Sequence, residues 1–366
     1  MKVALIAGAR PNFVKIAPLR EALAAREGIT PIVVHTGQHY DDIMSAAFFR
    51  ELKIPAADFN LGVGSASHAV QTAKIMQSFD KFLDDQDVDL VAVVGDVNST
   101  VACSLTAVKR GIDVAHVEAG LRSRDWSMPE EINRIVTDAV STWLFTPSSD
   151  ADENLLKEGR PEEAIHLVGN IMVDTLLKFR NKALRNEELL FNLGLSPREY
   201  AVLTLHRPAN VDQRDAFDGI LSAVERIGEE LPVVYPMHPR SVKTLKAAGL
   251  GERAREIAGL TMTPPMGYLD FVMLEANARL VMTDSGGVQE ETTVLGVPCL
   301  TLRKNTERPV TITQGTNRVV GTDEESIVAA ALEVLEEREP RTAGPPELWD
   351  GKTAERIADL LEGAAR

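Results

Sequence analysis

The sequence contains only two cysteines, Cys103 and Cys299, which lie far apart in apolar surroundings. This argues against a disulfide framework and against a thiolate metal site, and it is typical of a reducing cytoplasm. There is no run of 18 or more apolar residues, so no membrane span is predicted. The first residues, "MKVALIAGARPNF", have too short an apolar part for a signal peptide and predict a strand. We therefore expect a cytoplasmic protein.

Basic residues are also fewer than acidic ones: the chain has 39 Lys and Arg and 54 Asp and Glu, which gives a net charge of −15. This balance makes nucleic acid an unfavourable partner. It does not exclude a small polyanionic ligand, because a pocket can be basic on an acidic protein. With 366 residues, 44% of them hydrophobic and 25% charged, the chain is long enough for two ordinary globular domains.

The common cofactor and metal motifs are missing as well. The segment "AGARPN" lacks the G-x-G-x-x-G spacing, which disfavours a dinucleotide held in the usual turn. His116 and Glu118 form the H-x-E of zinc deaminases, but Cys299 continues as "LTLRK" without the second cysteine of a C-x-x-C pair. We therefore predict neither a metal site nor a cofactor.

What the sequence does contain is an alternation of short β-branched runs with helical patterns. The predicted strands span 3–9, 31–37, 90–96, 113–119, 143–148 and 166–169, and then 200–206, 232–238, 260–265, 279–286 and 297–302. Near-continuous apolar strands separated by helices predict parallel sheets covered on both faces. Two such series predict an α/β fold of two Rossmann-like domains, 1–170 and 171–349, facing each other across a cleft.

Polar residues follow many of these strands. They are Arg10, Gln38, His39, Asp96, Glu118, His206, His238 and Asp284. Ligands of doubly wound sheets bind at the carboxyl ends of the strands. Because both halves carry such residues, the pattern predicts a ligand site between the two domains.

The segment "TDSGGVQEE" predicts a strand, a small-residue turn and the start of a helix. Ser285, Gly286 and Gly287 would present backbone N–H groups at the positive end of that helix, where a phosphate binds well. An ordinary strand-to-helix turn is the alternative, because serine and glycine are favoured there in any case. Glu291, one turn further on, could accept hydrogen bonds from ribose hydroxyls or simply complement the helix dipole.

The segment "HVEAGLRSRDWSMPEEINR" gathers acidic and basic residues after a predicted strand. These residues have ordinary explanations, since Glu130 and Glu131 could complement a helix dipole and Arg134 could pair with Glu130 one turn away. Asp96, which follows an earlier predicted strand, could likewise cap a helix. Their occurrence together with Glu118, and with a phosphate turn in the other half, favours acid/base chemistry.

Taken together, these motifs resemble the non-hydrolysing UDP-N-acetylglucosamine 2-epimerases over essentially the whole chain. The matching segments are "GARPNFVKIAPL" (8–19), "HTGQHYD" (35–41), "GDVNST" (95–100), "HVEAGLRS" (116–123), "MPEEINR" (128–134), "TLHRPANVD" (204–212), "HPR" (238–240), "DSGGVQEE" (284–291), "GVPCLTLR" (296–303) and "NTERP" (305–309).

The resemblance implies a fold of the glycosyltransferase-B type, in which the final helix, about 350–366, returns to the first domain. It implies reversible conversion of UDP-GlcNAc to UDP-ManNAc through elimination of UDP to 2-acetamidoglucal, followed by re-addition. No cofactor or metal is needed. Family members are commonly homodimers, and the product supplies ManNAc-type precursors for surface polysaccharide.

The resemblance also assigns residues to roles. The acid/base and sugar-contacting residues would be Asp96, Glu118, Glu130, Arg134 and His206. The substrate-binding residues would be Arg10, Lys15, Met266, Phe271, Ser285, Gly286, Gly287, Glu291 and Arg308, with Phe271 against uracil, Glu291 at the ribose and Arg308 near the phosphates. A second, activating UDP-GlcNAc would contact Gln38, His39, Arg207 and His238. Since "QHYDDIM" departs from the "QHRQML"-like form of the activated members, that activation is a hypothesis.

Other functions share these features. A 2-epimerase acting on a modified UDP-sugar, such as a 2,3-diacetamido uronic acid, would keep the nucleotide site and differ only in its sugar pocket. A glycosyltransferase of the same fold would use the carboxylates to bind an acceptor. A regulator that binds a UDP-sugar would have no turnover at all.

Overall fold

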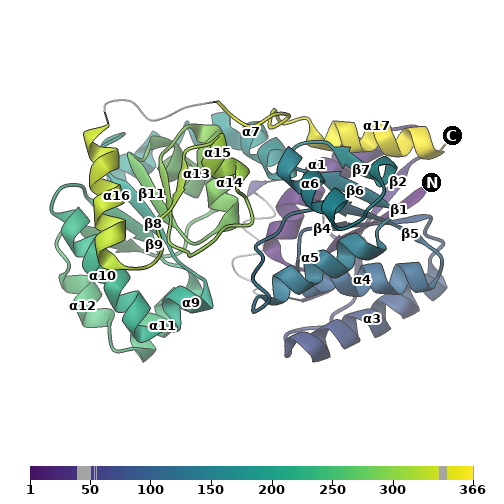
Figure 1. The fold of residues 1–366 in the computed structure, drawn as a ribbon, viewed down its shortest axis with the longest axis horizontal. Helices are drawn as coiled ribbons and strands as arrows, with labels where there is room; N and C mark the ends of the chain where they lie inside the picture. Colours follow the sequence, from purple (N-terminus) through teal and green to yellow (C-terminus); the bar gives the residue numbers. More distant parts are fainter. Residues whose placement is uncertain (39–50, 53, 55, 338–343, 366) are drawn as a thin grey trace. The chain divides into compact units, whose positions relative to one another are not determined.

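The computed structural model of the protein describes residues 1–38, 51, 52, 54, 56–337 and 344–365. The chain divides into two compact units, unit 1 (Met1–Lys178 with Glu347–Arg366) and unit 2 (Phe179–Pro346). Each unit contains one parallel sheet with helices on both faces, as Figure 1 shows. The predicted α/β class is therefore confirmed.

Unit 1 contains a seven-stranded parallel sheet. Its strands, in spatial order, are β3 (Phe59–Asn60), β2 (Thr30–His35), β1 (Lys2–Ala7), β4 (Leu90–Val94), β5 (Asp113–Val117), β6 (Trp143–Thr146) and β7 (Ile165–Leu167). The central strand β4 is apolar throughout because helices cover both faces, and every one of its residues is buried. Since the chain starts at the centre and later crosses β1 to β4, this is the doubly wound order.

Helices connect the strands of unit 1. They are α1 (Arg10–Ala24), α3 (His68–Asp85), α4 (Asn98–Lys109), α5 (Pro129–Val140), α6 (Ser149–Lys157), α7 (Ile171–Ala183) and α17 (Thr353–Ala365). Ile75, Phe79 and Phe82 of α3 are buried against the sheet, as their helical spacing predicts. Val70, in the first turn of the same helix, is 48% exposed, and its neighbours His68 and Ala69 are exposed as well.

The last helix belongs to unit 1, where α17 lies against α1 (Figure 1). Its first turn is capped by a side chain from α7. The Asp174 carboxylate accepts hydrogen bonds from the backbone N–H groups of Thr353, at 3.1 Å, and Ala354, at 2.7 Å. A helix start has no internal acceptors for these groups, so the buried Asp174 fixes where α17 begins.

Unit 2 repeats the plan with six parallel strands. In spatial order they are β10 (Leu260–Thr263), β9 (Val233–Pro236), β8 (Ala201–Thr204), β11 (Leu280–Thr283), β12 (Cys299–Thr301) and β13 (Asn317–Val319). Side chains of β8 alternate between two apolar clusters, since Ala201 and Leu203 face one and Val202 faces the other.

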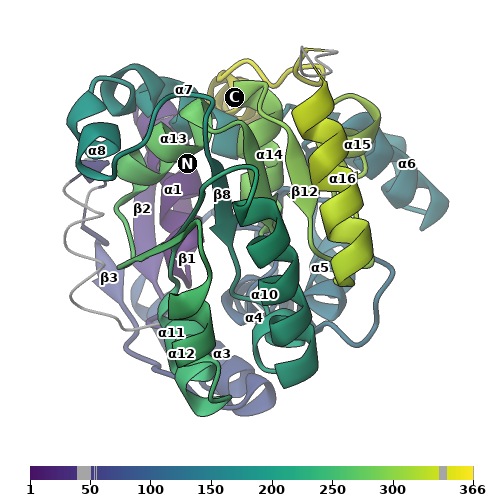
Figure 2. The ribbon, with the colours of Figure 1, turned by 90° about the vertical axis from the view of Figure 1, so that its left-hand side faces the viewer.

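The helices of unit 2 cover both faces of this sheet. They are α8 (Glu187–Asn192), α9 (Pro208–Val211), α10 (Arg214–Gly228), α11 (Pro239–Ala247), α12 (Gly251–Glu256), α13 (Tyr268–Asn277), α14 (Gly286–Leu295), α15 (Val310–Thr313) and α16 (Glu324–Glu336). Helices α10 and α16 pack together over one face, as Figure 2 shows, while α13 and α14 contribute to the cluster on the other face.

Several strands end earlier than predicted. The strands expected over 90–96 and 113–119 end at Val94 and Val117. The next residues leave the extended conformation, since Gly95 has a φ of 68° and Glu118 a φ of 70°. Asp96 and Glu118 therefore lie on loops just beyond the carboxyl edge of the sheet. Within the described part of the chain, no helix combines the length and the apolar character needed to cross a membrane.

Candidate active site

In unit 1, Glu118 forms a buried ion pair with Lys15 of α1. The pair occupies space that a side chain at position 95 would need, because a Cβ on Gly95 would lie 3.2 Å from Glu118 Oε2 and 3.6 Å from Lys15 Nζ. Asn12, in the first turn of α1, links that helix to β4, because its side-chain amide donates to the carbonyl oxygen of Val94 at 2.9 Å. The structure thus brings together two residues that the sequence assigns to different motifs.

The backbone of Glu118 is strained. A φ of 70° costs a non-glycine residue about 1–3 kcal/mol, and such residues concentrate at functional sites. Its neighbours hold it there, since Ala119 N–H donates to Phe145 at 3.1 Å and Gly120 N–H donates to Asp138, also at 3.1 Å. The second carboxylate oxygen, Oε1, is buried and has no hydrogen-bond partner among the described residues. A buried acceptor of this kind calls for a partner from outside the chain.

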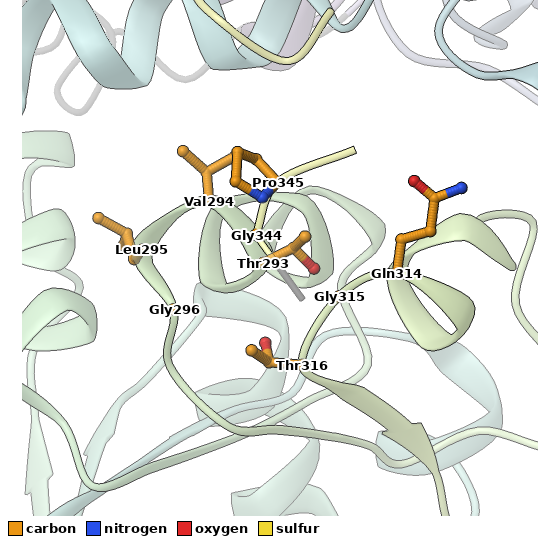
Figure 3. A pocket seen from close by; sticks show the side chains of 9 residues that line it. All are labelled: Thr293, Val294, Leu295, Gly296, Gln314, Gly315, Thr316, Gly344 and Pro345. Atoms are coloured by element: carbon orange, nitrogen blue, oxygen red, sulfur yellow. The ribbon is translucent and has the colours of Figure 1, made fainter. Parts of the chain in front are cut away.

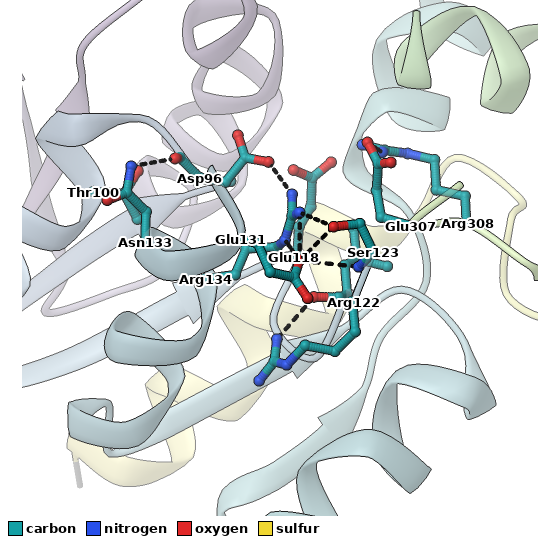
Figure 4. A network of polar contacts seen from close by, with 12 residues as sticks. Asp96, Thr100, Glu118, Arg122, Ser123, Glu131, Asn133, Arg134, Glu307 and Arg308 are labelled. Carbon is teal, nitrogen blue, oxygen red and sulfur yellow. Dashed lines mark hydrogen bonds and ion pairs between the residues drawn. The ribbon is translucent and has the colours of Figure 1, made fainter. Parts of the chain in front are cut away.

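Asp96 and Arg134 form a second ion pair in unit 1 (Figure 4). Arg134 is almost fully buried, and its guanidinium also binds Glu131 on the preceding turn of α5, at 2.6 Å. A helix cap was the alternative to an acid/base role for Asp96, but the N-cap of α4 is Val97, and the Asp96 side chain accepts from Arg134. Arg134 therefore positions Asp96, which remains about one-third exposed.

The two neighbouring glutamates of α5 differ in role. Glu131 is fully buried and accepts hydrogen bonds from the backbone N–H groups of Ser123, at 2.9 Å, and Arg124, at 2.8 Å. Burial acts to raise its pKa, but the bonds from Ser123 and Arg134 outweigh it and lower the pKa below the ordinary value. Glu130 is half-buried and makes no hydrogen bond or ion pair with any residue that the structure describes. Glu131 is structural, and Glu130 has its carboxylate available.

A buried ion network supports the loop after β5. Asp138 of α5 accepts from His116 Nδ1 at 2.6 Å and contacts Arg122 at 2.7 Å. The other ring nitrogen of His116 lies 2.9 Å from the carbonyl oxygen of Gly95. Burial opposes ionisation of Asp138, but His116 and then Arg122 hold its pKa below the ordinary value. The network therefore connects the backbone carbonyl of Gly95, just before Asp96, to the backbone N–H of Gly120, two residues after Glu118.

In unit 2, the imidazole of His206 is oriented by Asp284. His206 Nδ1 lies 2.8 Å from Asp284 Oδ1, and the buried carboxylate also accepts from the backbone N–H groups of His206 and Arg207. Burial acts to raise the pKa of Asp284, but its hydrogen bond with His206 outweighs this and lowers it. The His206 side chain remains 38% exposed. An oriented, accessible imidazole is suited to moving a proton.

The predicted phosphate turn begins helix α14. Ser285 is its N-cap residue and makes no side-chain capping bond, so the helix start lacks an internal acceptor. A Cβ on Gly286 would lie 2.8 Å from Cζ of Arg308 and 3.1 Å from Glu307 Oε1. The glycine therefore lets a guanidinium approach the positive end of the helix. This arrangement favours an anion.

Glu291 lies one turn into α14, where it is buried and accepts a hydrogen bond from the Tyr268 hydroxyl at 2.9 Å. Burial raises the pKa of Glu291 to about 7, although the bond from Tyr268 acts in the opposite direction. Glu275 of α13 is also fully buried, and burial together with the charge of Glu291 raises its pKa well above the ordinary value.

The other residues predicted to bind the substrate lie in different parts of the two units. Met266 and Phe271 are both partly buried against the apolar cluster under α13. Arg10 is the first residue of α1, and Gly287 lies in the first turn of α14. The role expected for each stays a prediction.

Of the residues expected at a second site, Gln38 is buried and its side-chain oxygen accepts from the Ser99 hydroxyl at 2.7 Å. His238 is exposed, begins α11, and has its ring 5.7 Å from that of His206. Arg207 donates to the carbonyl oxygen of Asp284 at 3.1 Å. His39 lies outside the described residues. Activation through this site stays a prediction.

A cavity of about 200 Å³ lies elsewhere in unit 2, at the carboxyl end of α14 (Figure 3). Thr293, Gly296, Gln314 and Thr316 contribute to its wall. None of the predicted site residues lines it, and it lies at the opposite end of α14 from Ser285.

Comparison with known proteins identifies relatives along the whole chain. A sequence profile described as UDP-N-acetylglucosamine 2-epimerase matches residues 21–362. The UDP-N-acetylglucosamine 2-epimerase of Methanocaldococcus jannaschii is 42% identical over 365 residues, which cover 99% of each chain. The UDP-2,3-diacetamido-2,3-dideoxy-D-glucuronate 2-epimerase of Pseudomonas aeruginosa is 38% identical over 335 residues, which cover 90% of this chain and 91% of the relative.

A solved structure gives the same result. The crystal structure of the Methanocaldococcus jannaschii UDP-GlcNAc 2-epimerase in complex with UDP-GlcNAc and UDP superposes with a TM-score of 0.90. The sequences are 41% identical, and the match covers 99% of each chain.

Proposed function

Because the chain belongs to the UDP-N-acetylglucosamine 2-epimerase family, we propose that it interconverts UDP-GlcNAc and UDP-ManNAc by inverting C2. In the forward direction a base removes the C2 proton while the C1–O bond to UDP breaks, which gives 2-acetamidoglucal and UDP. A proton then returns to the opposite face of C2, and UDP adds back to C1. The two steps balance without an oxidant, a reductant or water.

The observation that carries this proposal is the state of Glu118. Its backbone is strained, one carboxylate oxygen binds Lys15, and the other is buried without a partner among the described residues. Strain and an unsatisfied buried acceptor together are expected at a site completed by substrate. We assign Glu118 to contact with the sugar and to proton transfer at C2.

Three further groups supply the remaining acid/base chemistry. Glu130 has an available carboxylate, Asp96 is positioned by Arg134, and His206 is oriented by Asp284. Inversion requires proton transfer on both faces of C2, so at least two differently placed groups must act. We assign the proton transfers to this set without dividing the two directions among its members.

We assign the UDP moiety to unit 2. The start of α14 and the guanidinium of Arg308 form an anion site, and Glu291 lies one turn further along the same helix. Departure of UDP places negative charge on the diphosphate, which oriented N–H groups and a cation stabilise. Glu291 is assigned to the ribose hydroxyls, and Phe271 and Met266 to the side of the uracil.

The proposal is tested by proton NMR of the purified protein with UDP-GlcNAc in D2O and no added cofactor. UDP-ManNAc carrying deuterium at C2 is the expected product. A transferase or a non-catalytic binder would leave C2 protonated, and that outcome would reject epimerisation of this substrate.

The Pseudomonas aeruginosa relative supports a second substrate class, since its name specifies a UDP-2,3-diacetamido-2,3-dideoxy-D-glucuronate. The same NMR measurement with that sugar nucleotide separates the two. Faster C2 exchange with the uronic acid would reassign the sugar pocket and leave the UDP site unchanged.

The resemblance also supports a homodimer in the cytoplasm that supplies ManNAc-type precursors for surface polysaccharide. The molar mass from light scattering tests the first of these expectations. A mass near 39.9 kDa would mean a monomer.

A further inference from the structure

Three arginines of unit 2 converge on one carboxylate, that of Glu307. Arg308 Nη1 lies 2.6 Å from Glu307 Oε1, Arg207 Nη2 lies 3.3 Å from the same oxygen, and Arg303 Nη2 lies 2.8 Å from Oε2. Arg207 lies in the loop after β8, and both Arg303 and Arg308 lie in the loop after β12, so two loops supply the set. We name these three residues the arginine cluster.

The arginine cluster lies at the start of α14. A Cβ on Gly286 would meet both Arg308 and Glu307. The positive end of the helix dipole and the Arg308 guanidinium therefore act on the same position, where a phosphate is assigned by the proposed function.

The arginine cluster brings three guanidinium groups close together. Among the described residues, they contact the carboxylates of Glu307 and of Glu290, which binds Arg308 at 2.6 Å. Burial, and then the charges of Arg207 and Arg308, lower the pKa of Arg303 against the opposing effect of Glu307. Arrangements that crowd buried cations in this way are stabilised by an added anion.

Arg303 has unused hydrogen-bonding capacity. Its side chain is 6% exposed, and its Nη1 is buried with no hydrogen-bond partner among the residues that the structure describes. A buried guanidinium nitrogen without an acceptor is costly, and a guanidinium presents its donors in a planar fork that matches phosphate oxygens.

We propose that Glu307 is an internal counter-ion that keeps the arginine cluster assembled for the diphosphate, and that Arg303 is an additional cationic ligand of that group. The inference rests on the proposed function, because that function supplies the diphosphate. When UDP binds, its phosphate oxygens take over guanidinium donors that Glu307 holds in the empty protein. Arg303 then acts most strongly when UDP carries its full charge as the leaving group.

The test is calorimetric titration of the full-length protein with UDP and with uridine, which lacks the phosphates. We expect R303Q to weaken UDP binding by about tenfold or more, the loss of a charge-assisted hydrogen bond, and to leave uridine binding unchanged. R226Q is the matched control, since Arg226 of the same unit forms an exposed ion pair. R303K should restore part of the affinity because it keeps the charge.

The second variant, E307Q, distinguishes a counter-ion role of Glu307 from a purely structural role. E307Q keeps the shape and an acceptor but removes the charge that competes with the diphosphate, so we expect tighter UDP binding and a lower melting temperature without UDP. If E307Q weakens UDP binding, or if R303Q binds UDP as the unaltered protein does, the proposal is wrong. If R303Q does not fold, the UDP affinities of E307Q and R303K still test the proposal. Failure of the unaltered protein to bind UDP would instead reject the proposed function.

Discussion

His206 Nδ1 lies 2.8 Å from a carboxylate oxygen of Asp284, a fully buried residue at the end of the neighbouring strand β11. The contact fixes the orientation of the imidazole, whose other ring nitrogen makes no hydrogen bond with any described residue. It resembles the way in which a carboxylate orients a general base in other enzymes.

Asp284→Asn should therefore impair catalysis through His206. We expect a loss of C2 exchange of about 100-fold, within the range of general acid/base contributions, and a displaced pH profile. Deuterium incorporation measured over a pH series checks this. Asp212→Asn, which alters an exposed pair with Arg240, is the control. An unchanged pH profile in Asp284→Asn would mean that Asp284 only holds the loop after β8.

Glu118→Gln should remove proton transfer while UDP binding remains. We expect C2 exchange to fall by about 100-fold to 10,000-fold, because the amide cannot accept the proton. UDP affinity should not change, since UDP is assigned to unit 2. Parallel exchange and calorimetric measurements test both parts. Equal exchange rates in the two proteins would remove Glu118 from the acid/base set.

Gly286→Ala should disrupt the phosphate turn without unfolding unit 2. The new Cβ would lie 2.8 Å from Cζ of Arg308, which has to move away from the helix start. We expect UDP affinity to fall by about tenfold, the value of one charge-assisted hydrogen bond. Gly219→Ala in α10 is the matched control, because its Cβ would meet nothing closer than 3.9 Å. Equal UDP affinity in the two variants would contradict the predicted contact.

Glu291 should make unfolding free energy fall as pH rises from about 4.5 to 7. Its pKa in the folded protein is raised to about 7 from an ordinary value of 4.5, so in this window the folded state retains a proton that the unfolded chain loses. Stability then falls by at most about 1.4 kcal/mol per pH unit for one proton. Asp138 and Asp284 have lowered pKa values, so their contributions are lost only as pH falls below the ordinary carboxyl range.

The measurement compares urea unfolding of the unaltered protein and Glu291→Gln at several pH values. The difference in stability between them should grow with pH across this window. A constant difference would mean that folding does not raise the pKa of Glu291.

Asp174→Ala should loosen the last helix. It removes the acceptor for two N–H groups at the start of α17, and loss of a helix cap costs about 1 kcal/mol. Hydrogen exchange of residues 353–365 should accelerate, with little change in unit 2. Uniform acceleration in both units would show a global effect instead.

Much of the fold could be predicted from the sequence because buried parallel strands are apolar along their whole length. The family and the fold of the glycosyltransferase-B type are confirmed. Strands β3 and β13 were not predicted, since Phe59–Asn60 and Asn317–Val319 are too short to form a recognisable run. Val70 of α3 is apolar and yet exposed, because an apolar residue type does not by itself reveal which turns of a helix contact the sheet.

The side-chain partners in the site were harder to predict. Asp284 and His206 are far apart in sequence and meet because β8 and β11 are neighbours in the sheet. Arg303 and Arg308 lie close to Glu307 in the sequence, but Arg207 comes from the loop after β8, and local spacing gives no sign of that third contact. The sequence predicts which residue types collect at strand ends, and the strand order determines which of them touch.

The position of α17 has a consequence for synthesis of the chain. Unit 2 is an insertion within unit 1, because the chain leaves unit 1 in α7 and returns only for the last helix. All of unit 2 has therefore been translated before the partner of Asp174 exists, and domains generally fold as they emerge. Unit 1 carries the candidate acid/base residues Glu118 and Glu130, and it completes its structure last. A chain that ended before residue 353 would carry a complete unit 2, to which UDP is assigned, attached to a unit 1 that lacks its last helix.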